Sequence, residues 1–91
     1  MKTQTFDSVW DALEDNPVKA KNLKLRAELL TVIISCIEES GSTQQETAKQ
    51  LGITQPRVNA LLKGKIEDFR LDSLVNIAHK LGLTVSVEIA A

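Results

Sequence analysis

Cysteine, histidine and aromatic residues are almost absent from this sequence of 91 residues. There is one cysteine, Cys36, one histidine, His79, and the aromatic residues are Phe6, Trp10 and Phe69. A single cysteine excludes a disulfide within the chain, and one cysteine with one histidine provides too few of the usual ligands for a zinc site in a monomer. Because 43% of the residues are hydrophobic and only 3% aromatic, we expect one small domain with an aliphatic core and no metal or other cofactor.

Long hydrophobic runs are absent as well. None approaches the ~20 residues of a membrane span, and the opening MKTQTFDSVW lacks the apolar core of a signal peptide. We therefore expect a cytoplasmic protein without a membrane partner. The sequence offers no paired carboxylates in a plausible cleft, no nucleophile with a base and no glycine-rich phosphate loop, so we do not expect an enzyme. Cys36 is interpreted as structural and His79 as a solvated residue near a helix end.

Charge is distributed unevenly along the chain. Residues 1–16 contain one lysine against four acidic residues, a balance of -3, whereas residues 42–65 contain four cations against one glutamate, a balance of +3. The formal net charge of -1 therefore conceals an acidic front and a basic middle. This asymmetry suggests two partners of opposite charge, although a solvated face is an equally good explanation of the charges alone.

Apolar residues recur at helical spacing in four segments. Asn16 and Pro17 suit the start of a long helix that ends at Gly41, and shorter helices are expected after Thr43, after Thr54 and from about Leu71. The predicted inward-facing residues, in chain order, are Leu23, Ala27, Leu30, Ile34, Ile37, Ala48, Leu51, Val58, Leu61, Leu62, Leu71, Leu74, Val75, Ala78 and Leu81.

The two short helices in the middle have clear start signals. Thr43 followed by Glu46 matches a capping box, and Thr54 caps the next helix, which Gln55 opens. Pro56 lies in the first turn, where a missing amide hydrogen breaks no helical hydrogen bond. Two short capped helices joined at Gly52, with a longer helix before them, predict a helix-turn-helix.

The outer face of the second short helix has side chains that suit a DNA major groove. Gln and Asn can bond adenine, Arg can bond guanine, and small apolar groups can contact thymine methyls. The predicted base-reading residues are Gln55, Pro56, Arg57, Asn59 and Ala60. Lys63 and Lys65 are expected to meet phosphate where the helix leaves the groove, and Gln44 with the free amides of the preceding helix to hold the backbone on the other side. The predicted phosphate-contacting residues are Thr43, Gln44, Thr54, Lys63 and Lys65.

The last residues alternate between apolar and polar side chains. The apolar members are Leu83, Val85, Val87 and Ile89. This period of two predicts a half-buried strand. Such a strand needs a partner, which could be the segment KTQTF near the start, the same strand of a second copy, or the sheet of another protein. A frayed apolar end is the remaining alternative.

The stretch TQQETAKQLGITQPRVNALLKGK, followed by LDSLVNIAHKLG, resembles the five-helix DNA-binding domain of the lambda Cro and repressor (XRE) family. With FDSVWDAL, KLRAEL and the closing LTVSVEI, nearly the whole chain is similar to the small HigA-like antitoxins, which partner ribonuclease toxins of the RelE superfamily. The resemblance implies an all-α fold with an acidic extension and short helix in residues 1–16, a helix-turn-helix domain in 17–82 and a strand in 83–91. Thr47, in place of a common aliphatic residue, and Pro56, in place of a polar base-reading residue, depart from the pattern.

The leading hypothesis is a sequence-specific repressor that binds a palindromic operator on double-stranded DNA as a homodimer and neutralises a RelE-superfamily toxin. It would be nucleoid-associated when bound to its operator. The alternatives are a stand-alone XRE-type regulator without a toxin, and a helical protein-interaction module whose basic face is only solvated. By the resemblance, Gln55, Arg57 and Asn59 match base-contacting positions.

Overall fold

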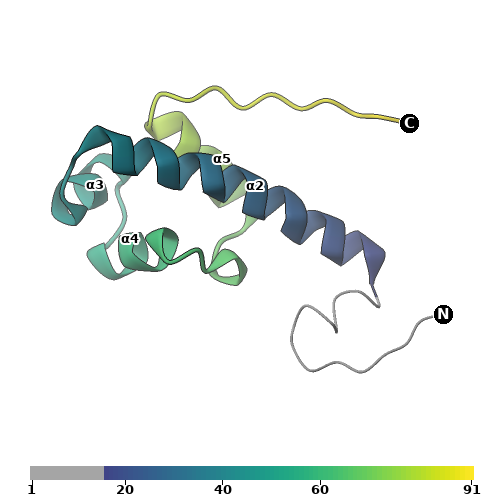
Figure 1. Cartoon of the computed structure of the whole chain (residues 1–91), viewed down its shortest axis with the longest axis horizontal. Coiled ribbons are helices and arrows are strands. Elements are labelled where there is room, and N and C mark those ends of the chain that lie inside the picture. Colours follow the sequence, from purple (N-terminus) through teal and green to yellow (C-terminus); the bar gives the residue numbers. More distant parts are fainter. Residues whose placement is uncertain (1–15) are drawn as a thin grey trace.

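The computed structural model describes residues 16–91, and within them it has four α-helices and a short 3-10 turn (Figure 1). Their bounds are α2 (Pro17–Ser40), α3 (Gln44–Leu51), α4 (Gln55–Leu62), η1 (Ile66–Asp68) and α5 (Leu71–Lys80). The all-α prediction is confirmed for this part of the chain. The short N-terminal helix expected in residues 1–16 falls almost wholly outside the described residues, so a count of five helices is not reached among residues 16–91.

The long helix α2 begins and ends where the sequence indicated. The Asn16 side chain accepts a hydrogen bond from the Lys19 amide at 3.2 Å, and Pro17 occupies the first turn. Gly41 ends the helix in the left-handed conformation with φ +71°, a region that other residues adopt only at a cost. Helices α4 and α5 and the turn η1 pack against this long helix, whereas α3 packs on α4 and α5.

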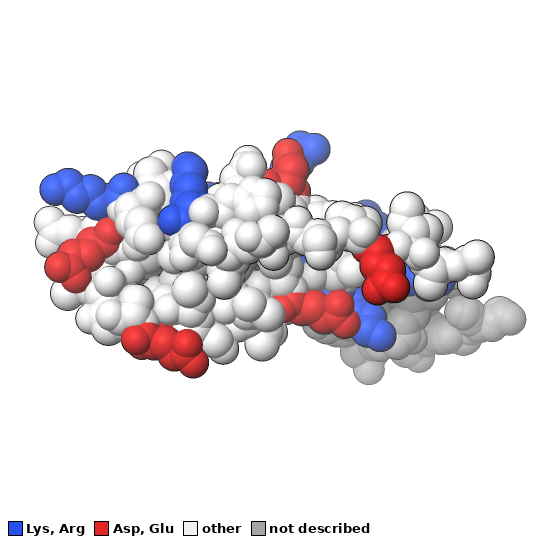
Figure 2. Space-filling model, turned by 90° about the horizontal axis from the view of Figure 1, so that it is seen from above, with Lys and Arg blue, Asp and Glu red and all other residues white. Residues whose placement is uncertain are grey.

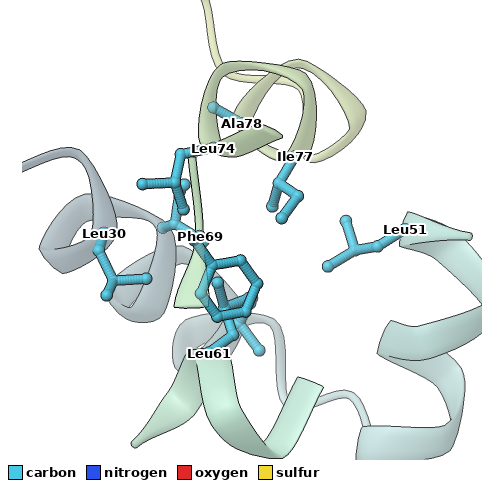
Figure 3. Packing of buried hydrophobic residues seen from close by; sticks show 9 residues of the cluster. Leu30, Leu51, Leu61, Phe69, Leu74, Ile77 and Ala78 are labelled. Carbon is cyan, nitrogen blue, oxygen red and sulfur yellow. The ribbon is translucent and has the colours of Figure 1, made fainter. Parts of the chain in front are cut away.

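The core lies between α2, α5 and the helix-turn-helix pair (Figure 3). Its centre is formed by nine residues, Leu30, Ile33, Ile37, Leu51, Leu61, Phe69, Leu74, Ile77 and Ala78. Phe69, fully buried at the end of the connector after η1, is the largest of them. The core is therefore aliphatic around one aromatic ring, in agreement with the composition.

The predicted inward faces miss one buried residue on α2, Ile33, and one on α5, Ile77. Six predicted members are only half-buried: Ala27, Ile34, Leu62, Leu71, Val75 and Leu81. On α2 the reason is that α5 and η1 both pack against it, so the buried stripe is wider than the single row that a spacing of three and four residues selects. Thr47 is buried at 2% exposure, so the departure from an aliphatic residue places a hydroxyl in the interior.

The predicted C-terminal strand does not form within the described chain. Residues 83–91 follow α5 as an extended segment that takes part in no β-ladder. The Leu83 amide donates to the Ala78 carbonyl at 3.0 Å, and Leu83 and Val85 pack against the core. Further along, Val87 and Ile89 are 84% and 90% exposed. An alternating sequence needs a neighbouring strand to become a strand, and residues 16–91 supply none.

The segment of residues 83–91, called the tail below, runs back over the molecule beside α2 (Figure 1). An apolar groove of about 450 Å³ lies between the tail, α2 and the start of α5. It is lined by Leu25, Glu28, Leu29, Leu71, Val75 and residues 85–88. Figure 2, seen from the tail's side, shows a broad area without charged side chains on this face.

None of the helices among residues 16–91 is long and apolar enough to cross a membrane.

Candidate nucleic-acid interface

Helices α3 and α4 form a helix-turn-helix whose two starts are fixed by side-chain caps. The Glu46 amide donates to Thr43 Oγ1 at 3.1 Å, and the Thr43 amide donates to Glu46 Oε1 at 2.9 Å, which completes the predicted capping box. The Arg57 amide donates to Thr54 Oγ1 at 3.3 Å at the start of α4. Gly52 closes α3 with φ +69°. Each predicted cap is confirmed, so the start of each helix and the end of α3 follow from local sequence signals.

The inner sides of the two helices hold the pair on the core. Leu51, Val58 and Leu61 are each fully buried, and α3 and α4 pack against each other. The opposite side of α4 is therefore turned outward by the periodicity of the helix.

The start of α4 presents two of the predicted base-reading residues to solvent. Gln55 and Pro56 are exposed, whereas Asn59 and Ala60 are half-buried. Ala60 also packs against the core, so it lies at the edge of the outer face rather than at its centre. The site residues remain predictions, but the geometry favours the first turn of α4 as the part that reaches a ligand.

Arg57 is directed to the protein rather than outward. Its guanidinium carbon lies 4.2 Å from the centroid of the Phe69 ring, and its Nη1 donates to the Asp68 carbonyl at 3.0 Å. A cation over an aromatic face in this position stabilises the connector between α4 and α5. For Arg57 to bond a guanine it would have to leave both contacts, so in this conformation it positions α4 instead of reading a base.

The predicted phosphate-contacting residues lie at the ends of the two short helices. Gln44 is exposed at the start of α3, and Lys63 and Lys65 are exposed after α4. The hydroxyls of Thr43 and Thr54 accept helix amides, as capping requires, and both residues are exposed. A hydroxyl that caps a helix can still donate its own hydrogen, so phosphate contact is compatible with capping.

The cations of this region form no close ion pair with an acid among residues 16–91. Across residues 16–91 the structure has no carboxylate within 4 Å of the charged nitrogens of Lys49, Arg57, Lys63 or Lys65. Glu46, the single acid between residues 42 and 65, has one carboxylate oxygen engaged in the capping box. The surface around α3 and α4 therefore retains a positive charge that suits a polyanion.

Two cations that sequence reasoning missed make long-range contacts, Lys80 with α3 and Arg26 with the connector between η1 and α5. Lys80 Nζ at the end of α5 donates to the Leu51 carbonyl at 2.9 Å and so completes the C-terminus of α3. The Gln50 side chain returns a hydrogen bond to the Lys80 carbonyl at 3.3 Å. Arg26 of α2 donates from Nη1 to the Phe69 carbonyl at 3.1 Å. These contacts join residues 29 to 43 positions apart, and no local pattern in the sequence indicates them.

The comparison with protein families agrees with this geometry. A family model described as a helix-turn-helix domain matches residues 12–90. No curated protein matches the chain. A helix-turn-helix domain suggests DNA binding and regulation of transcription, in which the second helix of the motif enters the major groove. Because the match extends over nearly the entire sequence and the structure contains the capped α3 and α4 pair, the chain belongs to the helix-turn-helix domain family.

Proposed function

We propose that this protein is a sequence-specific DNA-binding repressor that acts as a homodimer. The observation that carries the proposal is the capped pair of α3 and α4. Its second helix opens with exposed Gln55 and Pro56, beside cations that have no carboxylate within 4 Å among residues 16–91. The protein acts by binding rather than by catalysis.

The first turn of α4 would enter the major groove. There Gln55 can bond adenine N6 and N7, while the ring of Pro56 can rest against a thymine methyl. Half-buried Asn59 lies one turn further on and would reach the edge of the groove. Gln44, Lys63 and Lys65 would meet phosphates on either side and fix the register of the helix.

A dimer is expected because one recognition helix spans only a few base pairs. Two copies on half-sites one turn apart, about 10 base pairs, would give the affinity that an operator requires. The tail supports this arrangement. Its backbone forms no ladder within residues 16–91, its outer apolar side chains are exposed, and it borders an apolar groove. Pairing of the tail with that of a second copy would satisfy all three features at once.

The decisive test of the DNA proposal is selection of binding sites from random duplex DNA, followed by titration of the selected site. We expect an inverted repeat, with affinity weakened about tenfold or more by Gln55→Ala. Lys63→Ala should reduce the slope of log affinity against log salt by about one per half-site, whereas Lys24→Ala, an exposed lysine on α2, should leave it unchanged. Recovery of no motif, with binding indifferent to Gln55, would leave only the protein-interaction alternative.

The dimer is tested with a shortened tail. Because Leu83 and Val85 pack on the core, removal of residues 86–91 is a cleaner change than removal of the entire tail. We expect the shortened protein to fold with unchanged helix content and to sediment as a monomer. A shortened protein that stays dimeric would show that the tail does not form the two-fold contact.

A finer proposal is that the repressor is the antitoxin of a toxin-antitoxin pair and neutralises a RelE-superfamily ribonuclease. It is supported by the similarity to HigA-like antitoxins and by the balance of -3 in residues 1–16, which would complement a basic ribonuclease surface. The test is co-expression with the neighbouring gene. Co-purification of a toxin that requires residues 1–15 would support it, and a chain that represses its operator without any such partner would be a stand-alone regulator.

A further inference from the structure

A small pocket lies between the helix-turn-helix and α5 and shares no lining residue with the groove beside the tail. Its volume is about 170 Å³. Its polar lining comes from Arg57, Ser73, Asn76 and Lys80, and its apolar floor from Leu51, Ile53 and Ile77. Two cations, a hydroxyl and an amide from α4 and α5 thus surround one hollow.

Both cations in the pocket are held in place by backbone carbonyls rather than by acids. Arg57 Nη1 lies 3.0 Å from the Asp68 oxygen, and Lys80 Nζ lies 2.9 Å from the Leu51 oxygen. In the described part of the chain, no carboxylate lies within 4 Å of either charged group. The two positive charges are therefore fixed in position but not neutralised.

The pocket also has more hydrogen-bond donors than acceptors. A guanidinium has five N–H donors and an ammonium has three, and the bonds just described use one of each. The hydroxyl of Ser73 and the side-chain amide of Asn76 make no hydrogen bond with any residue between 16 and 91. A ligand that accepts several hydrogen bonds and carries negative charge would match this surplus.

We propose that this pocket binds a phosphate group. A phosphate offers oxygens in several directions and a charge that two cations can balance, and Arg is well suited to it because two of its N–H groups can bond the same anion. The positions of both cations are already set by the carbonyls, so little side-chain freedom is lost on binding.

The phosphate can come from either of two sources. One is a phosphodiester of bound DNA, since Arg57 belongs to α4, and the other is a free phosphate-bearing effector. In both cases the anion would brace α4 against α5 at the end of α3, where Lys80 already joins two of these helices. The DNA source rests on the proposed function, whereas binding of free phosphate does not.

The first experiment titrates inorganic phosphate into the full-length protein at constant pH and ionic strength, with amide chemical shifts recorded by NMR. We expect saturable shifts at Ser73 and Asn76. Ser73→Ala and Lys80→Met should each weaken binding by about tenfold or more. Lys24→Met, an exposed lysine on α2 outside the pocket, is the matched control and should bind phosphate as the wild type does. Shifts that do not saturate, or binding that is weakened equally by Lys24→Met, would contradict the proposed phosphate site.

Because Lys80→Met also removes a cap from α3, Ser73→Ala serves as the variant that leaves the fold intact. A protein in which Ser73→Ala and Asn76→Leu both bind phosphate normally contradicts the proposal whatever Lys80→Met does.

A second titration, with the selected operator bound, separates the two sources. If a DNA phosphate fills the pocket, the complex no longer takes up free phosphate, and Lys80→Met lowers the salt slope by about one per half-site. If the ligand is a free effector, phosphate still binds the complex with Ser73 and Asn76 shifted. If the protein does not bind DNA, the titration with inorganic phosphate still tests the pocket. The DNA-binding proposal and the phosphate-binding proposal can therefore be contradicted independently.

Discussion

The helix-turn-helix of residues 43–62 and the tail of residues 83–91 carry equally regular sequence patterns but have different structures. In the first, the predicted caps form at Thr43 and Thr54, and the predicted inward residues Leu51, Val58 and Leu61 are buried. In the tail, an alternation of four apolar residues gives only an extended segment, exposed over its last half. A helix forms its contacts between residues three or four positions apart, whereas a strand forms its backbone hydrogen bonds only with another strand.

The two regions differ in whether their structure is fully determined by contacts within the described chain. The capped pair has a defined shape without any ligand, as expected for a surface that must fit a groove. Beyond Val85, the backbone of the tail makes no hydrogen bond with any residue between 16 and 91, and Val87 and Ile89 are exposed near the groove beside α2. The exposed end of the tail is therefore the ground for inferring a second copy, whereas the DNA proposal rests on the preformed surface of α3 and α4.

The largest expected effect distinguishes the buried face of α4 from the tail. Leu61→Ala empties a fully buried site and should lower the free energy of unfolding by about 2 to 5 kcal/mol. Val87→Ala, at a residue that is 84% exposed, should change it by less than about 0.5 kcal/mol. Urea denaturation of both variants at a concentration that keeps the protein monomeric makes the measurement. Equal losses would mean that the tail belongs to the folded unit.

A second expected effect separates positioning from recognition within α4. Arg57→Ala removes the cation from the Phe69 face and a hydrogen bond to the Asp68 carbonyl, and should cost about 1 to 2 kcal/mol of stability. Gln55→Ala, at an exposed position, should leave stability unchanged and weaken operator binding. Thermal unfolding and operator titration of both variants test this. If Arg57→Ala is as stable as the wild type but loses base preference at one position, Arg57 reads a base after all.

The caps provide a third and smaller effect. Thr43→Ala removes the acceptor of the Glu46 amide and half of the capping box, at a cost of about 1 kcal/mol. Thr84→Ala replaces the same residue type in the tail, where no cap is present, and should have no measurable effect. Both are measured by urea denaturation. A loss of stability in Thr84→Ala that matches Thr43→Ala would show that tail residues are as strongly ordered as those of α3.

The same contrast explains what could be predicted from the sequence. The helix starts at Asn16, Thr43 and Thr54 and the end at Gly52 depend on side chains next to the helix they limit, so each was foreseen. The width of the buried face of α2 was not predicted, because that width depends on which elements pack against the helix. The buried residue Ile33 was missed for this reason.

In the candidate site, the identity of the exposed residues at the start of α4 followed from helical periodicity. The direction of the Arg57 side chain did not, since Phe69 lies twelve residues away and its ring position depends on the connector. The contact of Lys80 with α3 spans 29 residues and was likewise beyond any local pattern. Long side chains choose among several partners, and only the folded chain decides which is near.

The smallest expected effect concerns how the tail leaves the domain. The Val85 amide donates to His79 Nε2 at 3.4 Å, a long hydrogen bond on an exposed histidine that was interpreted from the sequence as solvated. His79→Ala should therefore cost less than about 0.5 kcal/mol and raise the exchange rate of the Val85 amide by about twofold. Leu83 is held separately by the Ala78 carbonyl, so its amide serves as the internal control and should exchange at an unchanged rate. Hydrogen exchange followed by NMR compares the two amides in one sample. A large increase in the exchange rates of both amides would mean that His79 anchors the whole tail to α5. Loss of the His79 contact would then also free Leu83, which packs against the core.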